Sequence, residues 1–239
     1  MKTATIFCHA EGGEGPQRLK QILENRGLSL TILFTPKATP EDFAKARDSD
    51  FLVVMGGSMS VCNAPQHPYL YNEIEILQNR LAEDSPTLGI CLGSQLMAKA
   101  LGKEVFKGEQ GPEIGWAPLT LTEAGKNHPI RHLAGPETYV VHWHQDTHEL
   151  PEGATRLAFS EHYEIQAYSV GKKALGLQCH PEVDNRQVYG WLETEGRNIQ
   201  ESRIAKNATE IEEQTRLHMK IMNEQADLFF NEWLMSVEL

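Results

Sequence analysis

Short apolar runs rich in β-branched residues alternate with helix-like segments through the first hundred positions of the chain. This alternation is typical of a parallel sheet whose strands are connected by helices. It predicts strands at 3–8, 29–34, 51–55 and 87–90, and helices at 17–26, from 40 onward, at 69–83 and at 94–101. Gly27 and Gly102 follow two of these helices, where a glycine commonly ends a helix.

The second half of the chain has a different pattern. Strand-like pieces with turns lie at 114–121, 137–143, 155–160, 164–169 and 173–179. Helices are expected at 186–195 and at about 208–236. The second carries an apolar stripe that we expect to pack on the same domain rather than on a partner: Ile211, Leu217, Ile221, Leu228, Phe229 and Trp233. We therefore expect an α/β domain over 1–190, with a β-rich second half, and a helical C-terminal extension over 191–239.

The charge of the chain excludes some classes of partner. Lys and Arg number 22 against 33 Asp and Glu, for a net charge of -11, which disfavours binding to nucleic acids or anionic membranes. The first residues contain only a short apolar run, so we expect no signal peptide, no membrane span and a cytoplasmic protein. The four cysteines show no CxxC pairing, which favours free thiols over a zinc site or disulfides.

Cys91 lies between two glycines, Gly89 and Gly93, where a buried strand is expected to meet a helix. A nucleophile at such a junction has a strained backbone, and its neighbours must be small. The start of the helix favours the thiolate form. The backbone N–H groups of Leu92 and of Gly57, in the loop after the third strand, are candidate donors to an oxyanion. A buried structural cysteine is the alternative interpretation.

A candidate proton carrier lies in the segment Cys179-His180-Pro181-Glu182, after a probable core strand. Side chains two residues apart on an extended segment project to the same side, so Glu182 can orient the imidazole of His180. That imidazole would supply the proton that a departing amine needs. By the same alternation, Cys179 is expected to face the core. A three-residue His-Pro-Glu segment alone often forms a surface turn. Its occurrence together with the cysteine elbow upstream is what favours a catalytic role.

Together, the G-x-C-x-G-x-Q elbow, the Gly-Gly loop after the third strand and the downstream H-P-E resemble the class I glutamine amidotransferase family over about residues 45–185. The chain is similar to stand-alone relatives of the glutaminase domain of GMP synthase. The resemblance implies a flavodoxin-like, doubly wound, mostly parallel sheet. It also implies a cofactor-free triad of Cys91, His180 and Glu182 that hydrolyses the glutamine side-chain amide through a γ-glutamyl thioester and releases ammonia. The substrate-binding residues that it implies are Gln95, Glu113, His142, Trp143 and His144.

Several alternatives stay open. Because no synthetase domain is recognised after residue 185, the ammonia would pass to a separate synthetase subunit, or the enzyme would hydrolyse γ-glutamyl peptides or conjugates instead. A catalytically silent binding protein of the same fold is a further alternative. So is a thiol-dependent chaperone or deglycase, although such proteins usually have His where this chain has Leu92.

Two other motifs are expected to form neither a metal site nor a phosphate-binding loop. His142, His144 and His148 could suggest a metal site, but no acidic or cysteine ligand joins them at a fixed spacing, so we expect no metal. The glycine-rich segment 12–15 lacks the Lys-Ser/Thr of a phosphate-binding loop and is expected to be a turn.

Overall fold

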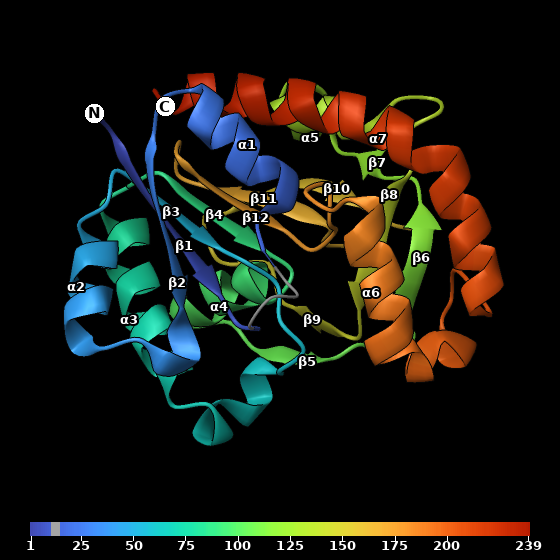
Figure 1. Cartoon of the computed structure of the whole chain (residues 1–239), viewed down its shortest axis with the longest axis horizontal. Coiled ribbons are helices and arrows are strands. Elements are labelled where there is room, and N and C mark those ends of the chain that lie inside the picture. The colour runs from blue at the N-terminus through green and yellow to red at the C-terminus, as the bar shows by residue number, and fades with distance from the viewer. Residues whose placement is uncertain (11–14) are drawn as a thin grey trace.

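The computed structural model describes residues 1–10 and 15–239, with the backbone alone for residues 17 and 195–198. Most of the glycine-rich segment 12–15 lies outside the described residues. The main sheet has eight strands in the order β2-β1-β3-β4-β12-β11-β10-β7 (Figure 1). Their bounds are β1 Thr3–Cys8, β2 Ser29–Phe34, β3 Phe51–Val54, β4 Thr87–Ile90, β7 Thr120–Leu121, β10 Thr155–Phe159, β11 Ala167–Val170 and β12 Ala174–Leu177.

Most of the main sheet is parallel. Each pair from β2 through β1, β3 and β4 to β12 runs in parallel, whereas β11, β10 and β7 continue the sheet in antiparallel fashion. The carboxyl ends of the parallel strands therefore meet at one edge, where ligands bind in open α/β sheets. This arrangement confirms the expected α/β fold with a mostly parallel sheet flanked by helices.

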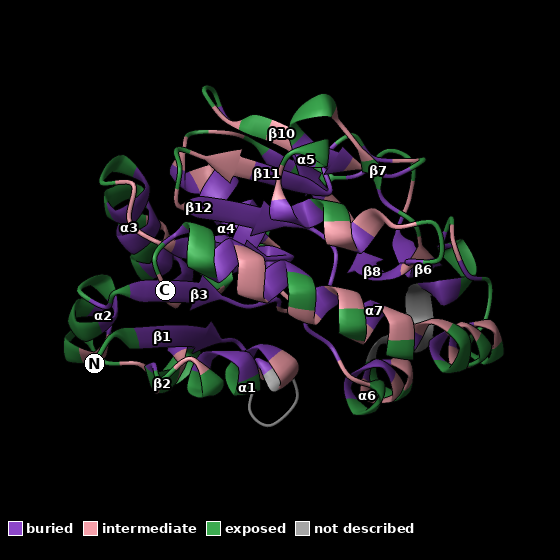
Figure 2. Ribbon diagram, turned by 90° about the horizontal axis from the view of Figure 1, so that it is seen from above, coloured by how far each residue is buried: buried purple, intermediate pink, exposed green. Residues whose placement is uncertain are grey.

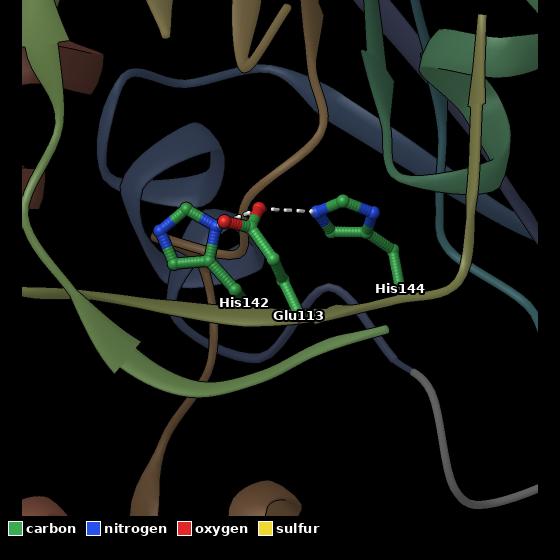
Figure 3. A group of neighbouring side chains, drawn as sticks. All are labelled: Glu113, His142 and His144. Carbon is green, nitrogen blue, oxygen red and sulfur yellow. Dashed lines mark hydrogen bonds and ion pairs between the residues drawn. The ribbon is translucent and has the colours of Figure 1, made fainter. Parts of the chain in front are cut away.

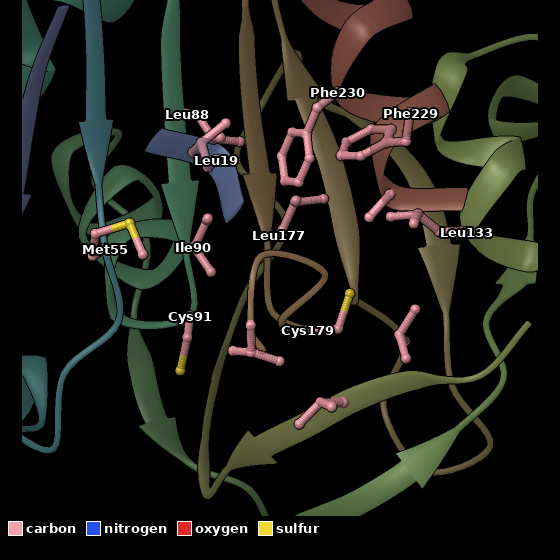
Figure 4. Packing of buried hydrophobic residues seen from close by; sticks show 14 of the residues in the cluster. Leu19, Met55, Leu88, Ile90, Cys91, Leu133, Leu177, Cys179, Phe229 and Phe230 are labelled. Atoms are coloured by element: carbon pink, nitrogen blue, oxygen red, sulfur yellow. The ribbon is translucent and has the colours of Figure 1, made fainter. Parts of the chain in front are cut away.

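Helices cover both faces of the main sheet (Figures 1 and 2). Alternate residues of β1 divide between two apolar clusters: Ile6 packs with α1 and α7, and Phe7 packs with α2, α3 and α4. In Figure 4, Phe229 and Phe230 of α7 lie over the sheet beside Leu177 of β12. The bounds are α1 Gln17–Asn25, α2 Pro40–Arg47, α3 Tyr69–Ala82, α4 Leu92–Ala100, α5 Glu123–Lys126, α6 Asn185–Glu195 and α7 Ala208–Ser236.

The second half of the chain adds two small sheets at the carboxyl edge. The expected strand 114–121 is divided into β6 Glu113–Ala117 and β7, which are separated by Pro118, a residue that lacks a ladder donor. β6 pairs with β8 Val140–His144, and β5 Val105–Lys107 pairs with β9 Asp146–His148. In the described part of the chain, four short 3-10 helices lie in the connections between the larger elements: η1 Thr35–Lys37, η2 Val61–Gln66, η3 Pro129–Ala134 and η4 Gly196–Glu201.

The stripe expected on α7 is partly wrong. Ile211, Phe229 and Trp233 are buried, but Leu217 is 69% exposed and Leu228 51% exposed. The buried face passes instead through Thr215, whose hydroxyl donates to the Ile211 carbonyl and accepts from the Trp116 indole. The expected stripe contained apolar residues only, so it omitted Thr215 and placed the buried face of α7 at the wrong angle around the helix.

The helix α7 packs on the same body as the main sheet, in contact with α1, α6, β6 and η3. The division of the chain at residue 190 stays a prediction. Among the described helices, none combines the length and the apolar character that crossing a bilayer would require.

Candidate active site

The candidate site lies at the carboxyl edge of the parallel strands. Cys91 follows β4, Gly56 follows β3, and His180 comes three residues after β12 ends. A Cβ atom built on Gly56 would lie 3.1 Å from His180 Cε1 and 3.6 Å from Cys91 Cβ. The three chain segments thus meet at one point, as the sequence indicated for the elbow, the Gly-Gly loop and the H-P-E segment.

The elbow at Cys91 has the strained backbone that its glycine neighbours predict. Cys91 has φ 50° and ψ -104°, and α4 begins at the next residue. Its N–H donates to the Leu177 carbonyl at 2.7 Å, which fixes the elbow to β12. A Cβ atom on Gly93 would lie 2.0 Å from the Val54 carbonyl oxygen, so only glycine allows α4 to approach β3 so closely.

The thiol of Cys91 is accessible from a pocket, although the residue is only 7% exposed. Figure 4 shows its side chain beyond the end of β4, next to Ile90 in the apolar cluster to which it belongs. The Sγ atom lies 3.8 Å from the Trp143 carbonyl oxygen. Cys179, by contrast, is fully buried in the core, as alternation predicted.

His180 and Glu182 form a buried pair, with Nδ1 lying 2.8 Å from Glu182 Oε1. Burial lowers the pKa of His180, but the charge of Glu182 and contact with the Cys91 thiol outweigh it and hold the pKa well above its ordinary value. These two neighbours therefore favour the charged form of the imidazole. Trp191 of α6 packs its ring against that of His180, with the centroids 4.8 Å apart, and restricts its orientation.

A pocket of about 590 Å³ opens in front of Cys91. Of the residues expected to contact substrate, Gln95, Trp143 and His144 line it, as does Gly57 of the predicted oxyanion loop. Glu113 and His142 do not line it but are buried beside His144, on the same face of the β6–β8 sheet. Leu92 is buried beside the pocket, since a Cβ atom on Gly57 would lie 2.8 Å from its side chain.

Asp146 is a pocket residue to which the sequence assigned no separate role. Its carboxylate accepts a hydrogen bond from the Ser60 hydroxyl, and its backbone carbonyl accepts one from Gln95 Nε2 at 3.1 Å. The pocket thus offers an anchored carboxylate, which can pair with a ligand's ammonium group.

A second buried pair supports the Gly-Gly loop and was missed from the sequence. His9 follows β1, and its Nδ1 lies 2.8 Å from the Gly56 carbonyl oxygen. Its Nε2 lies 3.1 Å from Glu73 Oε2, on α3. Both ring nitrogens face acceptors, so the protonated ring satisfies both at once. The pair fixes the peptide that leads into Gly57.

Glu113, His142 and His144 form a buried group whose possible metal-binding atoms all lie within 4.8 Å of one another. Burial raises the pKa of Glu113, but the hydrogen bond with His144 and the neighbouring imidazoles lower it to about 2. Burial lowers the pKa of His142 to about 4. The expectation that no acidic ligand joins these histidines is therefore wrong: strand pairing brings Glu113 to them.

Comparison with known proteins gives consistent matches. A family model described as "Glutamine amidotransferase class-I" matches residues 16–190. A "Putative glutamine amidotransferase-like protein" of Salmonella typhimurium is 34% identical over 215 residues, covering 87% of this chain and 88% of that protein. The crystal structure of a glutamine amidotransferase from Thermotoga maritima superposes with a TM-score of 0.80 at 29% identity, covering 98% of each chain.

Two further relatives have more specific names. A glutamine-hydrolyzing GMP synthase subunit of Sulfurisphaera tokodaii is 32% identical over 191 residues, covering 78% of this chain and 92% of that protein. "Gamma-glutamyl peptidase 4" of Arabidopsis thaliana is 36% identical over 112 residues, covering 42% of this chain and 41% of that protein.

Proposed function

Because the chain belongs to the class I glutamine amidotransferase family, we propose that it hydrolyses the side-chain amide of glutamine, with Cys91 as nucleophile. The observation that carries this proposal is the position of Cys91 at a strained elbow, in contact with a histidine that Glu182 orients. A thiol and a charged imidazole in contact form the nucleophile and proton donor that amide cleavage needs.

The reaction proceeds in two halves. The Cys91 thiolate attacks the amide carbon, and the N–H groups of Leu92 and Gly57 stabilise the oxyanion. The His180 imidazolium protonates the amide nitrogen as the carbon–nitrogen bond breaks, which releases ammonia and leaves a γ-glutamyl thioester. The neutral imidazole then takes a proton from water, which attacks the thioester and releases glutamate and the thiolate. Glu182 holds the ring in the tautomer that this cycle requires.

The pocket residues suit an amino-acid substrate. In our proposal the Asp146 carboxylate pairs with the substrate's α-ammonium group, and Gln95, Trp143 and His144 line the space around the substrate. The names of the relatives imply a partner for this reaction: a separate synthetase subunit that accepts the ammonia, since one relative is named as one subunit of a GMP synthase.

A second candidate function is hydrolysis of γ-glutamyl peptides or conjugates by the same triad. The pocket, about 590 Å³ in volume, falls within the range of roughly 300–1,000 Å³ that holds drug-sized ligands, whereas glutamine is much smaller. A relative named as a γ-glutamyl peptidase supports the same alternative.

Turnover by the purified chain tests both functions. We expect stoichiometric ammonia and glutamate from glutamine, with kcat/KM at least about tenfold above that for γ-glutamyl dipeptides, a ratio that corresponds to roughly 1.4 kcal/mol of preferential transition-state binding. The control is α-glutamyl dipeptide, which should not react. A preference for γ-glutamyl dipeptides over glutamine would favour the second function, and turnover of neither substrate would contradict both.

The buried pair that supports the Gly-Gly loop gives a further prediction. Glu73→Gln keeps the volume but removes the charge that holds His9 against the Gly56 carbonyl. We expect kcat to fall by about 10- to 100-fold with KM nearly unchanged. Removal of one oxyanion donor typically lowers kcat by about 10²- to 10³-fold, and a displaced Gly57 N–H would cause part of that loss. Steady-state kinetics with glutamine measure the effect.

Glu75→Gln is the matched control for this variant, because Glu75 is exposed on the same helix and the same charge is lost. Its kinetics should match those of the wild type. An equal loss of kcat in both variants, or a change in KM alone for Glu73→Gln, would contradict a role of the pair in the oxyanion loop.

A further inference from the structure

A carboxylate and two imidazoles are buried together in the two-stranded sheet of β6 and β8 (Figure 3). Glu113 pairs directly with His144 across the strands, and His142 lies two residues earlier on β8. Glu113 Oε2 lies 3.1 Å from His144 Nε2 and 3.6 Å from His142 Nδ1. The strand register thus gathers the nitrogen and oxygen donors typical of zinc sites.

The hydrogen bonds of His144 leave an acceptor facing the carboxylate. Its Nδ1 lies 3.2 Å from the Asp146 carbonyl oxygen, so Nδ1 carries a hydrogen and donates it. In the neutral ring, Nε2 then presents a lone pair to Glu113, and two acceptors in contact need a proton or a cation between them. Backbone carbonyls orient metal-binding histidines in the same way, leaving the other nitrogen free for the ion.

His142 provides an independent observation. The side chain is fully buried, and neither ring nitrogen makes a hydrogen bond of standard geometry with the described residues. The ring approaches the Ala117 backbone, and Nδ1 points at the Glu113 carboxylate from beyond hydrogen-bond range (Figure 3). Burying an imidazole in this way costs free energy, which a bond to a metal ion would offset.

Gln166 adds a fourth polar group. Its Nε2 lies 2.6 Å from Glu113 Oε2 and 3.4 Å from His144 Nε2, whereas its Oε1 has no hydrogen-bond partner among the described residues. A half-turn of the amide brings Oε1 to the same centre. Tetrahedral zinc with bonds of about 2.0–2.2 Å separates its ligands by roughly 3.4 Å, close to the 3.1 and 3.6 Å that separate Glu113 Oε2 from the two imidazole nitrogens.

We propose that Glu113, His142 and His144 bind one Zn²⁺ ion. The amide oxygen of Gln166 fills the fourth position, so the site is closed and structural rather than catalytic. The ion supplies the positive charge that the facing acceptors need. It ties β6 to β8, and so it stabilises the pocket wall that carries Trp143 and His144.

Metal binding by the full chain tests this assignment. After chelation and reloading with ZnCl₂, we expect about one zinc ion per chain by elemental mass spectrometry and a higher unfolding temperature than after chelation alone. His142→Asn should weaken zinc binding by at least about 100-fold, since loss of a ligand exceeds the 10- to 100-fold effect of outer partners. Glu113→Gln is a second variant, and circular dichroism checks that both fold.

Zinc could also bind the thiol of Cys91, so two controls separate the sites. Cys91→Ala should keep the ion, and Co²⁺ in its place should give ligand-field bands without thiolate charge transfer. His132→Asn, at a surface histidine paired with Glu232, should bind zinc as the wild type does. The proposal would be overturned if the wild type bound no zinc, if Cys91→Ala lost the ion, or if His142→Asn still bound one zinc ion per chain. A proton shared by the facing acceptors would then take the place of the ion.

Discussion

Cys91→Ala is expected to lower the release of ammonia from glutamine by at least about 10⁴-fold, because removing the nucleophile of a comparable triad costs about 10⁶-fold in kcat. Without the thiol, His180 and Glu182 have no sulfur to activate, and no thioester forms. The chain should still fold, because alanine keeps the Cβ atom and removes only the sulfur of a residue that lines the pocket. Ammonia release and thermal unfolding of the two purified proteins measure both expectations.

The control for this variant is Cys62→Ala, because Cys62 is an exposed cysteine that does not line the pocket. It should keep wild-type activity. A glutamine-mimicking electrophile followed by mass spectrometry should give one adduct, on Cys91, that glutamine prevents and that Cys62→Ala still forms. An active Cys91→Ala protein, or an adduct on Cys62 that glutamine prevents, would exclude the proposed nucleophile.

The parts of the site that depend on local spacing could be predicted from the sequence. The elbow follows from Gly89 and Gly93 around a cysteine, because close approach of backbone requires glycine whatever the rest of the fold. The contact of Glu182 with His180 was expected from the two-residue period of an extended chain. The two side chains do lie 2.8 Å apart, but Pro181 and Glu182 form a turn, so the contact arises from a turn and not from an extended segment.

The parts that depend on distant pairing could not be predicted. His9 and Glu73 are 64 residues apart, and a glutamate inside a helix normally faces solvent, so nothing in the sequence signals their contact. Glu113 meets His144 only because β6 and β8 pair in one register, in a small sheet whose boundaries depend on tertiary packing. Trp191 likewise reaches His180 through the packing of α6.

Gly93→Ala is expected to destabilise the fold severely, although alanine normally favours a helix over glycine. The added Cβ atom would lie 2.0 Å from the Val54 carbonyl oxygen and 2.8 Å from its carbon, so α4 must move away from β3. Overpacking commonly costs 1–3 kcal/mol, and because the clash is with backbone we expect at least about 3 kcal/mol. That cost lowers the unfolding temperature by at least roughly 6–12 °C, which calorimetry or circular dichroism measures.

Gly190→Ala makes the same chemical change in another helix and should have the opposite sign. Gly190 lies within α6, and apart from the adjacent backbone of that helix no atom of the described residues lies within 4 Å of a Cβ built there. Because no clash opposes it, the substitution acts mainly on the unfolded chain, which has fewer conformations with alanine than with glycine. This difference should raise the free energy of unfolding by about 0.5–1 kcal/mol. If Gly93→Ala were also neutral or stabilising, α4 could move from β3 without cost, and the close approach that positions Cys91 would not depend on glycine.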